Sequence, residues 1–168
     1  VCQTGCDSHP QVCVDMCDAK AFCAAVGKRL CGRIGGTSVT DADTANIGAS
    51  QWHNACSSHG ANAFSYGSTY DAEACHGSDD WAGTGVGSVA TASMSACQSG
   101  VPEYAGVFDM TGNVREWEDS CQGPEETDAC VVRGGSFYSA AAGLSCGGVS
   151  YSLRQVASEQ IGFRCCSR

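Results

Sequence analysis

The stretch that decides the fold of this chain is Phe108-Asp109-Met110-Thr111-Gly112-Asn113-Val114-Arg115-Glu116-Trp117. Acidic and amide residues stand here among large apolar ones, and Gly112 frees the backbone at the centre. A turn that offers carboxylates and carbonyls, held at both ends by large side chains, is a natural oxygen-ligand site for a hard cation. The same composition suits a polar turn whose groups bond one another, and the stretch alone leaves both interpretations open.

Two further motifs follow this stretch, and their order is informative. Residues 109–117 read Asp-Met-x-Gly-Asn-Val-x-Glu-Trp, residues 133–137 read Arg-Gly-Gly-Ser-Phe, and residues 162–164 read Gly-Phe-Arg. The order resembles the formylglycine-generating enzyme, or sulfatase-modifying factor, family, and residues 12–30 resemble the family's first helix. The resemblance covers most of the 168 residues and implies one domain over 1–168. It implies an α+β fold, a variant of the C-type lectin fold with little regular secondary structure, here rich in disulfides.

The start of the chain departs from that family's pattern. The family has a further N-terminal section that forms part of its sheet, and this sequence does not contain it. We therefore expect that the chain starts inside the domain, or that another segment or chain fills this place. No signal peptide is recognisable, so the sequence reads as mature or trimmed.

Fourteen cysteines are close to the content that is typical of a disulfide scaffold. No Cys-x-x-Cys pair occurs, and the even number favours disulfides over a metal cluster. Disulfides indicate an extracellular, periplasmic or cell-surface location. We expect Cys121 to pair with Cys130, because the short segment between them is rich in turn residues. Cys56 with Cys75 is a weaker expectation, and at most two thiols should be free.

The charge balance limits the classes of partner. Eighteen acidic residues against nine basic ones give a net charge of −9, which argues against nucleic acids and anionic membranes. No apolar run approaches the roughly 20 residues of a membrane-spanning helix. Four scattered histidines, at positions 9, 53, 59 and 76, have no carboxylate at the spacing of a zinc or iron site. The partner we expect is a protein or a glycan, with its identity left open.

Helical periodicity is strongest after Asp15, which suits the N-cap of a helix of about 12 residues. Its expected buried face carries Met16, Ala19, Phe22, Cys23 and Val26. Gly27 stands where the helix should end. A second helix is expected near Asp43–Ala55. Its expected buried side carries Ile47, Trp52 and Cys56.

Two strands are expected near the C-terminal motifs, at Val131–Phe137 and Ile161–Cys166, from their β-branched and aromatic residues. The segment Ser57–Gly87 has little periodicity and is long for a loop, so we expect a cross-linked or ion-bound excursion. Between the two strands, Tyr138–Gln160 is small and polar, and we expect an irregular surface segment there.

The resemblance implies a calcium ion at the deciding stretch. Its ligands would be the carboxylates of Asp109 and Glu116 and the backbone carbonyls of Gly112 and Val114. Two anionic groups and two carbonyls are ligands that calcium prefers. Arg115 would point away from the ion, or would neutralise Glu116 instead.

The resemblance also implies an oxidase that holds copper(I) between two cysteine thiolates. In the family, these cysteines stand three and eight residues after the Gly-Gly-Ser motif, where this chain has Ser139 and Leu144. Cys146 comes two residues later, and a serine hydroxyl does not replace a thiolate on copper(I). If the chain is catalytic, the residues concerned are Cys146 and Ser136, which matches the family's active-site serine. Otherwise Cys146 belongs to a structural disulfide.

Three functions therefore compete. The first is a secreted, non-catalytic binding or structural module on the family's scaffold. The second is a copper-dependent formylglycine-generating oxidase that acts on a substrate cysteine with an altered copper site. The third is a diversified, C-type-lectin-like ligand receptor, because such proteins vary residues in the matching C-terminal region. For the first hypothesis, the expected binding surface is residues 138–160, through Tyr138, Tyr151, Arg154 and Gln155, with an inert loop as the alternative.

Overall fold

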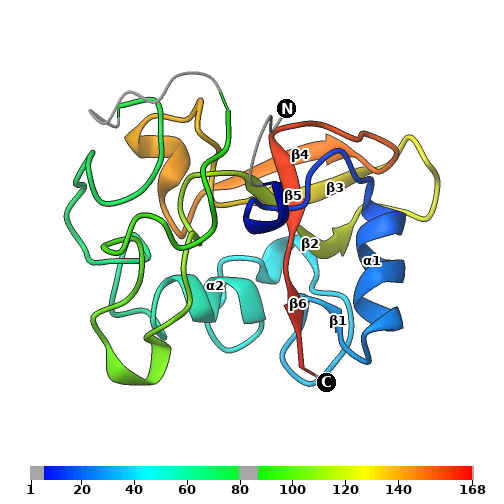
Figure 1. Cartoon of the computed structure of the whole chain (residues 1–168). Helices are drawn as coiled ribbons and strands as arrows, with labels where there is room; N and C mark the ends of the chain where they lie inside the picture. Colours follow the sequence, from blue (N-terminus) through cyan, green and yellow to red (C-terminus); the bar gives the residue numbers. More distant parts are fainter. Residues whose placement is uncertain (1–5, 80–86, 168) are drawn as a thin grey trace.

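The structure is a computed structural model, and it describes residues 6–79 and 87–167 (Figure 1). Four strands form the main sheet in the order β4-β3-β2-β5, and a small second sheet pairs β1 with β6. The helices are α1 (Met16–Ala25) and α2 (Gln51–Cys56), and the strands are β1 (Arg29–Leu30), β2 (Arg115–Cys121), β3 (Ala129–Arg133), β4 (Val149–Leu153), β5 (Ile161–Phe163) and β6 (Cys165–Cys166). Short 3-10 helices are η1 (Cys6–Ser8), η2 (Asp41–Asp43), η3 (Pro102–Tyr104) and η4 (Ala141–Leu144). This is the α+β fold with little regular structure that the sequence predicts.

Helix α1 forms where the sequence predicts it. The Asp15 carboxylate accepts a hydrogen bond from the Asp18 amide at 2.8 Å and so satisfies one free donor of the first turn. Gly27, at φ +75°, ends the helix, and its amide donates to the Ala24 carbonyl at 3.0 Å. The cap and the terminating glycine are therefore both the predicted residues.

The buried face of α1 is narrower than predicted. The fully buried residues are Met16, Ala19 and Cys23. Phe22 and Val26 were also expected on this face, but they are 55% and 53% exposed. The three buried residues lie within about 60° of arc around the helix axis, and Phe22 lies about 60° beyond them. Val26 follows the last residue of the helix. The Phe22 ring instead packs edge-on against Phe163, with 5.4 Å between ring centroids.

The second helix is shorter than the predicted span of Asp43–Ala55. Only η2 and α2 are helical there, and the residues between them form turns. Ser50 begins α2 as its N-cap, because its hydroxyl accepts the amide three residues later at 2.9 Å. Trp52 and Cys56 are buried as expected, whereas Ile47 is only half-buried.

Strand β3 ends at Arg133, four residues before the end of the predicted strand Val131–Phe137. Gly134 and Gly135 follow it with positive φ values of 82° and 71°, which no strand residue adopts. A Cβ at Gly134 would lie 2.5 Å from the Met110 carbonyl oxygen, so a side chain is excluded by close approach of the backbone. The Arg-Gly-Gly-Ser-Phe motif is therefore a strand end followed by a tight turn.

Two other expectations about strands need correction. The segment Tyr138–Gln160 is not irregular throughout, because it contains β4, which pairs antiparallel with β3. The five residues of β4 do alternate between apolar and polar, but the strand is short and stands among glycines and other small residues that are typical of loops. The predicted strand Ile161–Cys166 is divided into β5 and β6, which belong to different sheets. Arg164, between them, leaves the ladder to bond with distant groups.

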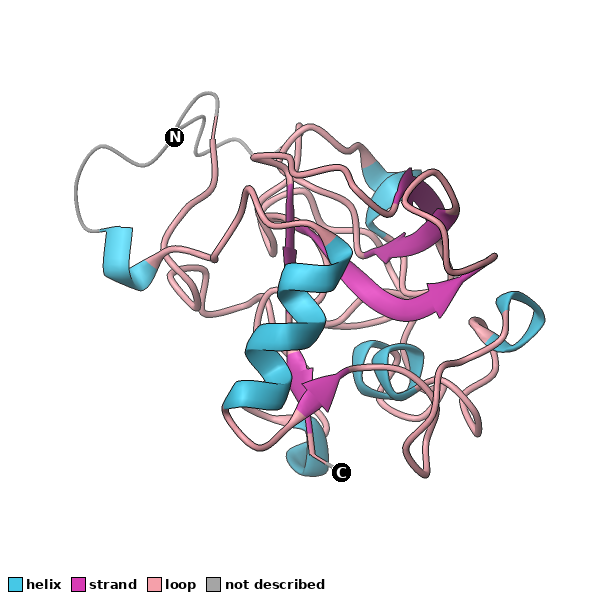
Figure 2. Cartoon of the chain, turned by 90° about the vertical axis from the view of Figure 1, so that its right-hand side faces the viewer, coloured by secondary structure: helices cyan, strands magenta, loops and turns pink. Residues whose placement is uncertain are grey.

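The core has two parts. Helix α1 lies across one face of the main sheet (Figure 2). The buried residues of this first cluster are Met16, Ala19, Cys23, Leu30, Trp117, Cys130, Val132 and Ile161. The second cluster contains Trp52, Cys56, Met110 and Cys146. No helix in the described ranges is long and apolar enough to cross a membrane.

Five disulfides cross-link the described residues. They are Cys23–Cys165, Cys31–Cys166, Cys56–Cys146, Cys75–Cys97 and Cys121–Cys130. The last of these is the pair that the sequence favours. Cys13 and Cys17 are unpaired and exposed, and Cys2 lies outside the described residues. The segment Ser57–Gly87 is cross-linked as expected, through Cys75, although residues 80–86 of it lie outside the described part.

Candidate functional site

The turn that leads into β2 joins three distant segments through Asn113. Its side-chain amide exchanges two hydrogen bonds with the Val89 backbone, at 3.0 and 3.2 Å. Its backbone amide donates to the His76 carbonyl at 2.7 Å, and its carbonyl accepts from the Phe137 amide at 2.9 Å. Gly112 passes so close to His76 that a Cβ would lie 2.3 Å from that carbonyl oxygen. Asn113 thus holds together the segments that surround the candidate site.

Glu116, one of the two carboxylates predicted to bind calcium, is paired with an arginine. Nε and Nη2 of Arg164 each lie 2.5 Å from one carboxylate oxygen, and the Trp52 indole donates to the same group at 2.7 Å. Arg164 also donates to the Phe108 carbonyl at 3.0 Å. The Gly-Phe-Arg motif therefore supplies a bidentate partner for the first motif. The neutralising cation is Arg164 and not Arg115.

The four predicted calcium ligands suit the ion in part. Asp109 is 9% exposed, and its Oδ2 accepts a backbone amide at 2.8 Å. Burial raises the pKa of Asp109, whereas the Ala92 amide and the charge of Arg164 oppose this rise. The carbonyls of Gly112 and Val114 accept no hydrogen bond from a described residue. Two carboxylates and two such carbonyls suit a hard cation, whereas the arginine partner of Glu116 competes with it. Calcium at this turn stays a prediction.

The loop after β3 holds the positions at which the family carries its reactive groups. Ser136 is fully buried, and its hydroxyl donates to the Gln160 side-chain oxygen at 3.2 Å. The Ser139 hydroxyl accepts the Ser136 amide at 3.0 Å. Leu144 is buried against Gly77, where a Cβ would lie 2.7 Å from the leucine Cδ1. The two positions of the family's thiolates are therefore occupied by side chains that hold the loop in place.

Cys146 is not a free thiol. Its sulfur is bonded to Cys56, and this buried disulfide joins the loop to α2. The expected pair of Cys56 with Cys75 is therefore wrong, and Cys75 is bonded to Cys97. The expected pair joined cysteines that are close in sequence. In the structure, α2 instead packs against the distant loop that carries Cys146. In this bonded state Cys146 offers no thiolate to copper(I), because a sulfur in a disulfide is not a thiolate.

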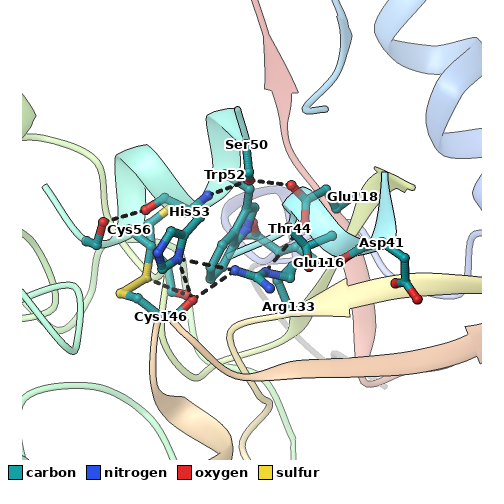
Figure 3. Close-up of polar contacts among 12 residues, drawn as sticks. Asp41, Thr44, Ser50, Trp52, His53, Cys56, Glu116, Glu118, Arg133 and Cys146 are labelled. Atoms are coloured by element: carbon teal, nitrogen blue, oxygen red, sulfur yellow. Dashed lines mark hydrogen bonds and ion pairs between the residues drawn. A yellow bond between two sulfur atoms is a disulfide. The ribbon is translucent and has the colours of Figure 1, made fainter. Parts of the chain in front are cut away.

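A buried polar network lies between α2 and β3 (Figure 3), and the sequence analysis did not predict it. Arg133 is 1% exposed and donates from Nη2 to the Cys146 carbonyl at 2.9 Å. Its guanidinium lies 4.7 Å from the Trp52 ring centroid, and its Nε lies 3.5 Å from a Glu118 carboxylate oxygen. The Ser50 hydroxyl donates to the other Glu118 oxygen at 2.5 Å. Through Arg133, the second motif fixes the backbone of the loop.

The Glu118–Arg133 pair is incompletely satisfied. The Oε2 of Glu118 and the Nε and Nη1 of Arg133 are buried without a hydrogen-bond partner among the described residues. Burial raises the pKa of Glu118 to about 7 and lowers the pKa of Arg133, and their mutual attraction opposes both shifts. Burial also lowers the pKa of His53, whose Nδ1 lies 2.9 Å from the Cys146 carbonyl. Burial thus penalises every charge in this network.

The four predicted ligand-binding residues have different surroundings. Tyr138 precedes η4, is 50% exposed, and its hydroxyl has no hydrogen-bond partner among the described residues. Tyr151, in β4, donates its hydroxyl to an aspartate of η2 at 2.7 Å. Arg154, after β4, donates to a loop carbonyl at 3.1 Å. Gln155 is exposed and bonds through its backbone amide, which leaves its side chain available. Of these four side chains, Tyr138 and Gln155 are therefore the most available to a ligand.

Within residues 6–79 and 87–167, no group of three or more His, Cys, Asp or Glu side chains is arranged to hold a metal ion. Two of the histidines bond with other side chains instead. His9 lies 3.2 Å from the Ser88 hydroxyl, and His59 lies 2.9 Å from the Asn54 side-chain nitrogen.

Comparison with known proteins gives a family and a fold. The sulfatase-modifying factor enzyme 1-like domain family matches residues 2–168. No curated protein sequence gives a significant match. Among solved structures, PvdO from Pseudomonas aeruginosa is similar with a TM-score of 0.65 at 20% identity, over 93% of this chain and 60% of PvdO. Variable protein 1 from Treponema denticola has a TM-score of 0.62 at 20% identity, over 93% of this chain and 70% of its own. CarF has a TM-score of 0.63 at 17% identity, over 97% of this chain and 69% of its own.

Proposed function

The chain belongs to the sulfatase-modifying factor enzyme 1-like domain family, and from this premise we propose that it is a non-catalytic binding module. The observation that carries the proposal is the bonded state of Cys146. Its sulfur forms a disulfide with Cys56, while Ser139 and Leu144 fill the positions of the family's two copper-binding cysteines. Copper(I) requires soft ligands such as thiolates, and the residues at this site do not supply them. The scaffold is kept and the reactive pair is replaced, which suits recognition rather than oxidation.

The proposed location is extracellular or periplasmic. Five disulfides join distant parts of the described chain, and such cross-links form and persist in oxidising compartments. The proposed partner is a protein or a glycan, because a net charge of −9 disfavours polyanions.

The proposed binding surface is the segment 138–160, with Tyr138 as its principal contact. The Tyr138 ring lies against Phe137, with 4.5 Å between centroids, and Phe137 stacks on His76 at 6.2 Å. This packing limits the motion of a half-exposed aromatic ring with a free hydroxyl. Rigid, amphipathic rings of this kind give contact area at low entropic cost. The side chains of Tyr151 and Arg154 would contribute less, because they already bond within the chain, whereas the exposed Gln155 side chain could bond a ligand.

We also propose a structural calcium ion at Asp109, Glu116 and the carbonyls of Gly112 and Val114. Its support is that both carboxylates are buried at this turn, and that the two carbonyls accept no hydrogen bond from a described residue. When bound, the ion would stabilise the turn that precedes β2 and would take no part in a reaction.

A copper assay tests the absence of catalysis. The oxidised protein should not compete with a copper(I) chelator, and it should not convert the cysteine of a test peptide to an aldehyde. The double variant Ser139→Cys/Leu144→Cys is the matched comparison, because it restores both thiols of the family pattern, and copper(I) binding should appear in it. Stoichiometric copper(I) binding and peptide turnover by the unaltered chain would contradict the proposal.

A second assay tests the binding surface. We expect hits on a glycan array or a peptide display library to be lost in Tyr138→Ala and kept in Tyr70→Ala, which removes a tyrosine outside the segment. Both variants should keep the melting temperature within a few degrees, so that lost binding is not lost folding. Binding that survives Tyr138→Ala would place the recognition surface elsewhere.

A diversified ligand receptor is the second candidate function. Its support is the similarity to variable protein 1 from Treponema denticola, which at 20% identity concerns the fold alone. Sequencing the segment 138–160 in several isolates distinguishes the candidates, because a diversified receptor would vary there while the flanking motifs stay constant.

A further inference from the structure

Strand β4 is an unprotected edge of the main sheet. It lies beside β3, on the side away from β2 (Figure 1). Its residues Val149–Leu153 read Val-Ser-Tyr-Ser-Leu, with no charge and no proline, and they pair with β3 in one continuous register without a bulge. Edge strands of soluble proteins normally carry a charge, a proline or a bulge that blocks further pairing. None of these devices is present in β4.

Hydrogen bonds around the strand show which of its residues face the open edge. In an antiparallel pair, only alternate residues bond the neighbouring strand. The Arg154 amide donates to the Asp128 carbonyl at 2.9 Å, in the same register as the β3–β4 ladder. Counting back by two, the residues of β4 that bond β3 are Ser152 and Ser150.

The other side of β3 gives the same assignment. The Gln122 amide donates to the Ala129 carbonyl at 2.9 Å, so Ala129 bonds toward β2, and the adjacent residues Asp128 and Cys130 bond toward β4. The backbone groups that face the open edge therefore belong to Val149, Tyr151 and Leu153. The Leu153 carbonyl accepts the Val156 amide at 2.9 Å, and no described residue is recorded as bonding the other outward groups.

We propose that β4 pairs antiparallel with β4 of a second copy of this chain, about a two-fold axis at Tyr151. Apolar residues and serines are arranged symmetrically about Tyr151 in this strand. In the proposed pairing, each apolar residue therefore faces an apolar residue and each serine faces a serine. Val149 faces Leu153 of the second copy, Ser150 faces Ser152, and Tyr151 faces Tyr151. Each outward residue then meets an outward residue, so their backbone groups can exchange hydrogen bonds. A two-fold interface requires such a self-complementary surface.

Exposure and charge set the strength of this contact. Tyr151 is 48% exposed and Leu153 is 44% exposed, so both have area left to bury. Cross-strand pairs of aromatic and apolar side chains stabilise a ladder. One five-residue strand is a small interface, and the net charge of −9 on each copy repels. The dimer should therefore be weak and reversible, and it should tighten as salt screens the repulsion. This inference concerns the backbone edge of β4 and does not involve Tyr138, the principal contact of the proposed ligand surface, so loss of binding in Tyr138→Ala and loss of the dimer are distinguishable.

Sedimentation equilibrium on the full chain tests the proposal, over a wide concentration range and at two salt concentrations. We expect a monomer–dimer equilibrium that shifts toward dimer at the higher salt. Hydrogen exchange gives the assignment: the amides of Val149, Tyr151 and Leu153 should slow as concentration rises, while those of Ser150 and Ser152 should not change. A monomer at all concentrations, or slowing of these amides only when another protein is added, would overturn self-pairing.

Variants at Tyr151 separate backbone pairing from other effects. Tyr151→Pro removes an outward N–H, which an edge strand tolerates, and dimer affinity should fall at least tenfold. Tyr151→Phe loses the hydroxyl contact with η2 but keeps the N–H, and it should still dimerise. If the proline variant does not fold, Tyr151→Lys places two cations across the axis on a half-exposed position and should give a folded monomer. A lysine variant that dimerises as tightly as the unaltered chain would refute the proposal.

Discussion

At the scale of single residues, Gly112 is the position at which the fold tolerates least change. Its φ is +82°, and a Cβ would lie 2.3 Å from the His76 carbonyl oxygen, a backbone atom that cannot rotate away. Gly112→Ala should therefore lower the free energy of unfolding by at least about 2 kcal/mol. Gly100→Ala is the control, because that glycine has open space around it and no positive φ. Urea denaturation of both variants measures the difference, and equal stability of the two would refute the argument.

Glu118 gives a second prediction at this scale, for the pH dependence of stability. Its pKa is raised by burial from 4.5 to about 7, so the folded state favours the protonated form. The stability that this preference contributes is complete below pH 4.5 and is lost as pH rises through about 7, in total about 3 kcal/mol. Glu118→Gln cannot titrate, so its stability should fall less than that of the unaltered chain between pH 5 and pH 8.

Only the difference in slope between the two proteins is diagnostic. Glu118→Gln also removes the countercharge of Arg133, but the unaltered chain has this countercharge in full only above about pH 7, where Glu118 is ionised. The lowered pKa of His53 acts in the opposite direction, but it acts in both proteins. Parallel pH profiles from urea denaturation would show that Glu118 does not titrate in this range.

The sequence contained a signal for part of this network. Glu116 and Glu118 are two residues apart in a strand, so their side chains share a face, and the face of Glu116 was already assigned to the site. Nothing in the sequence around Arg133 marked it as buried, because arginine side chains are mostly exposed. Its burial depends on the position of α2, which lies far away in sequence and brings Trp52 over the guanidinium. Contacts of this kind are set by tertiary packing and not by local pattern.

At the scale of elements, prediction succeeded where local forces suffice. Helix α1 has an N-cap, an apolar stripe and a terminating glycine, all within one stretch of chain. Strand β4 was missed because its five alternating residues stand among small and polar neighbours, and because its place in the sheet is given by the distant β3. The predicted helix near Asp43–Ala55 was too long, because Ser50 competes for backbone amides and restarts the helix.

The turn before β2 carries the prediction about calcium. If the ion binds there, adding calcium to the chelated protein should raise the melting temperature, and magnesium should not replace it. Asp109→Asn should weaken calcium binding at least about tenfold, because it removes one of two anionic ligands. Asp18→Asn, in α1, is the matched control and should bind calcium unchanged. An unchanged melting midpoint after chelation, with no metal by elemental analysis, would show that Arg164 and Trp52 satisfy Glu116 without an ion.

At the scale of the whole molecule, the motifs predicted the family and the fold, but not which cysteines form the long-range disulfides. The pair Cys121–Cys130 could be inferred because the turn between them is local. The partners of Cys56 and Cys75 could not, because they depend on which loops the fold brings together. The same holds for the C-terminus, where two adjacent cysteines of β6 bond α1 and the end of β1. Sequence spacing says little about such pairs, although they constrain the chain most.

The long-range disulfides lead to the last prediction, which compares a long and a short disulfide loop. Cys56–Cys146 spans 90 residues and Cys121–Cys130 spans 9. Cys31–Cys166 is unsuitable as the long loop, because Cys23–Cys165 already joins almost the same two points of the chain. In the chain-entropy view, a disulfide stabilises by restricting the unfolded chain, which gives about 4 kcal/mol for the long loop and about 3 kcal/mol for the short one. Replacing both cysteines of the long loop with serine should therefore lower the free energy of unfolding more than the same change in the short loop. Guanidinium denaturation of the two double variants, both under non-reducing conditions, measures the difference. A larger loss for the Cys121→Ser/Cys130→Ser variant would mean that native contacts of the buried Cys130, and not closure of the chain, determine what a disulfide contributes here.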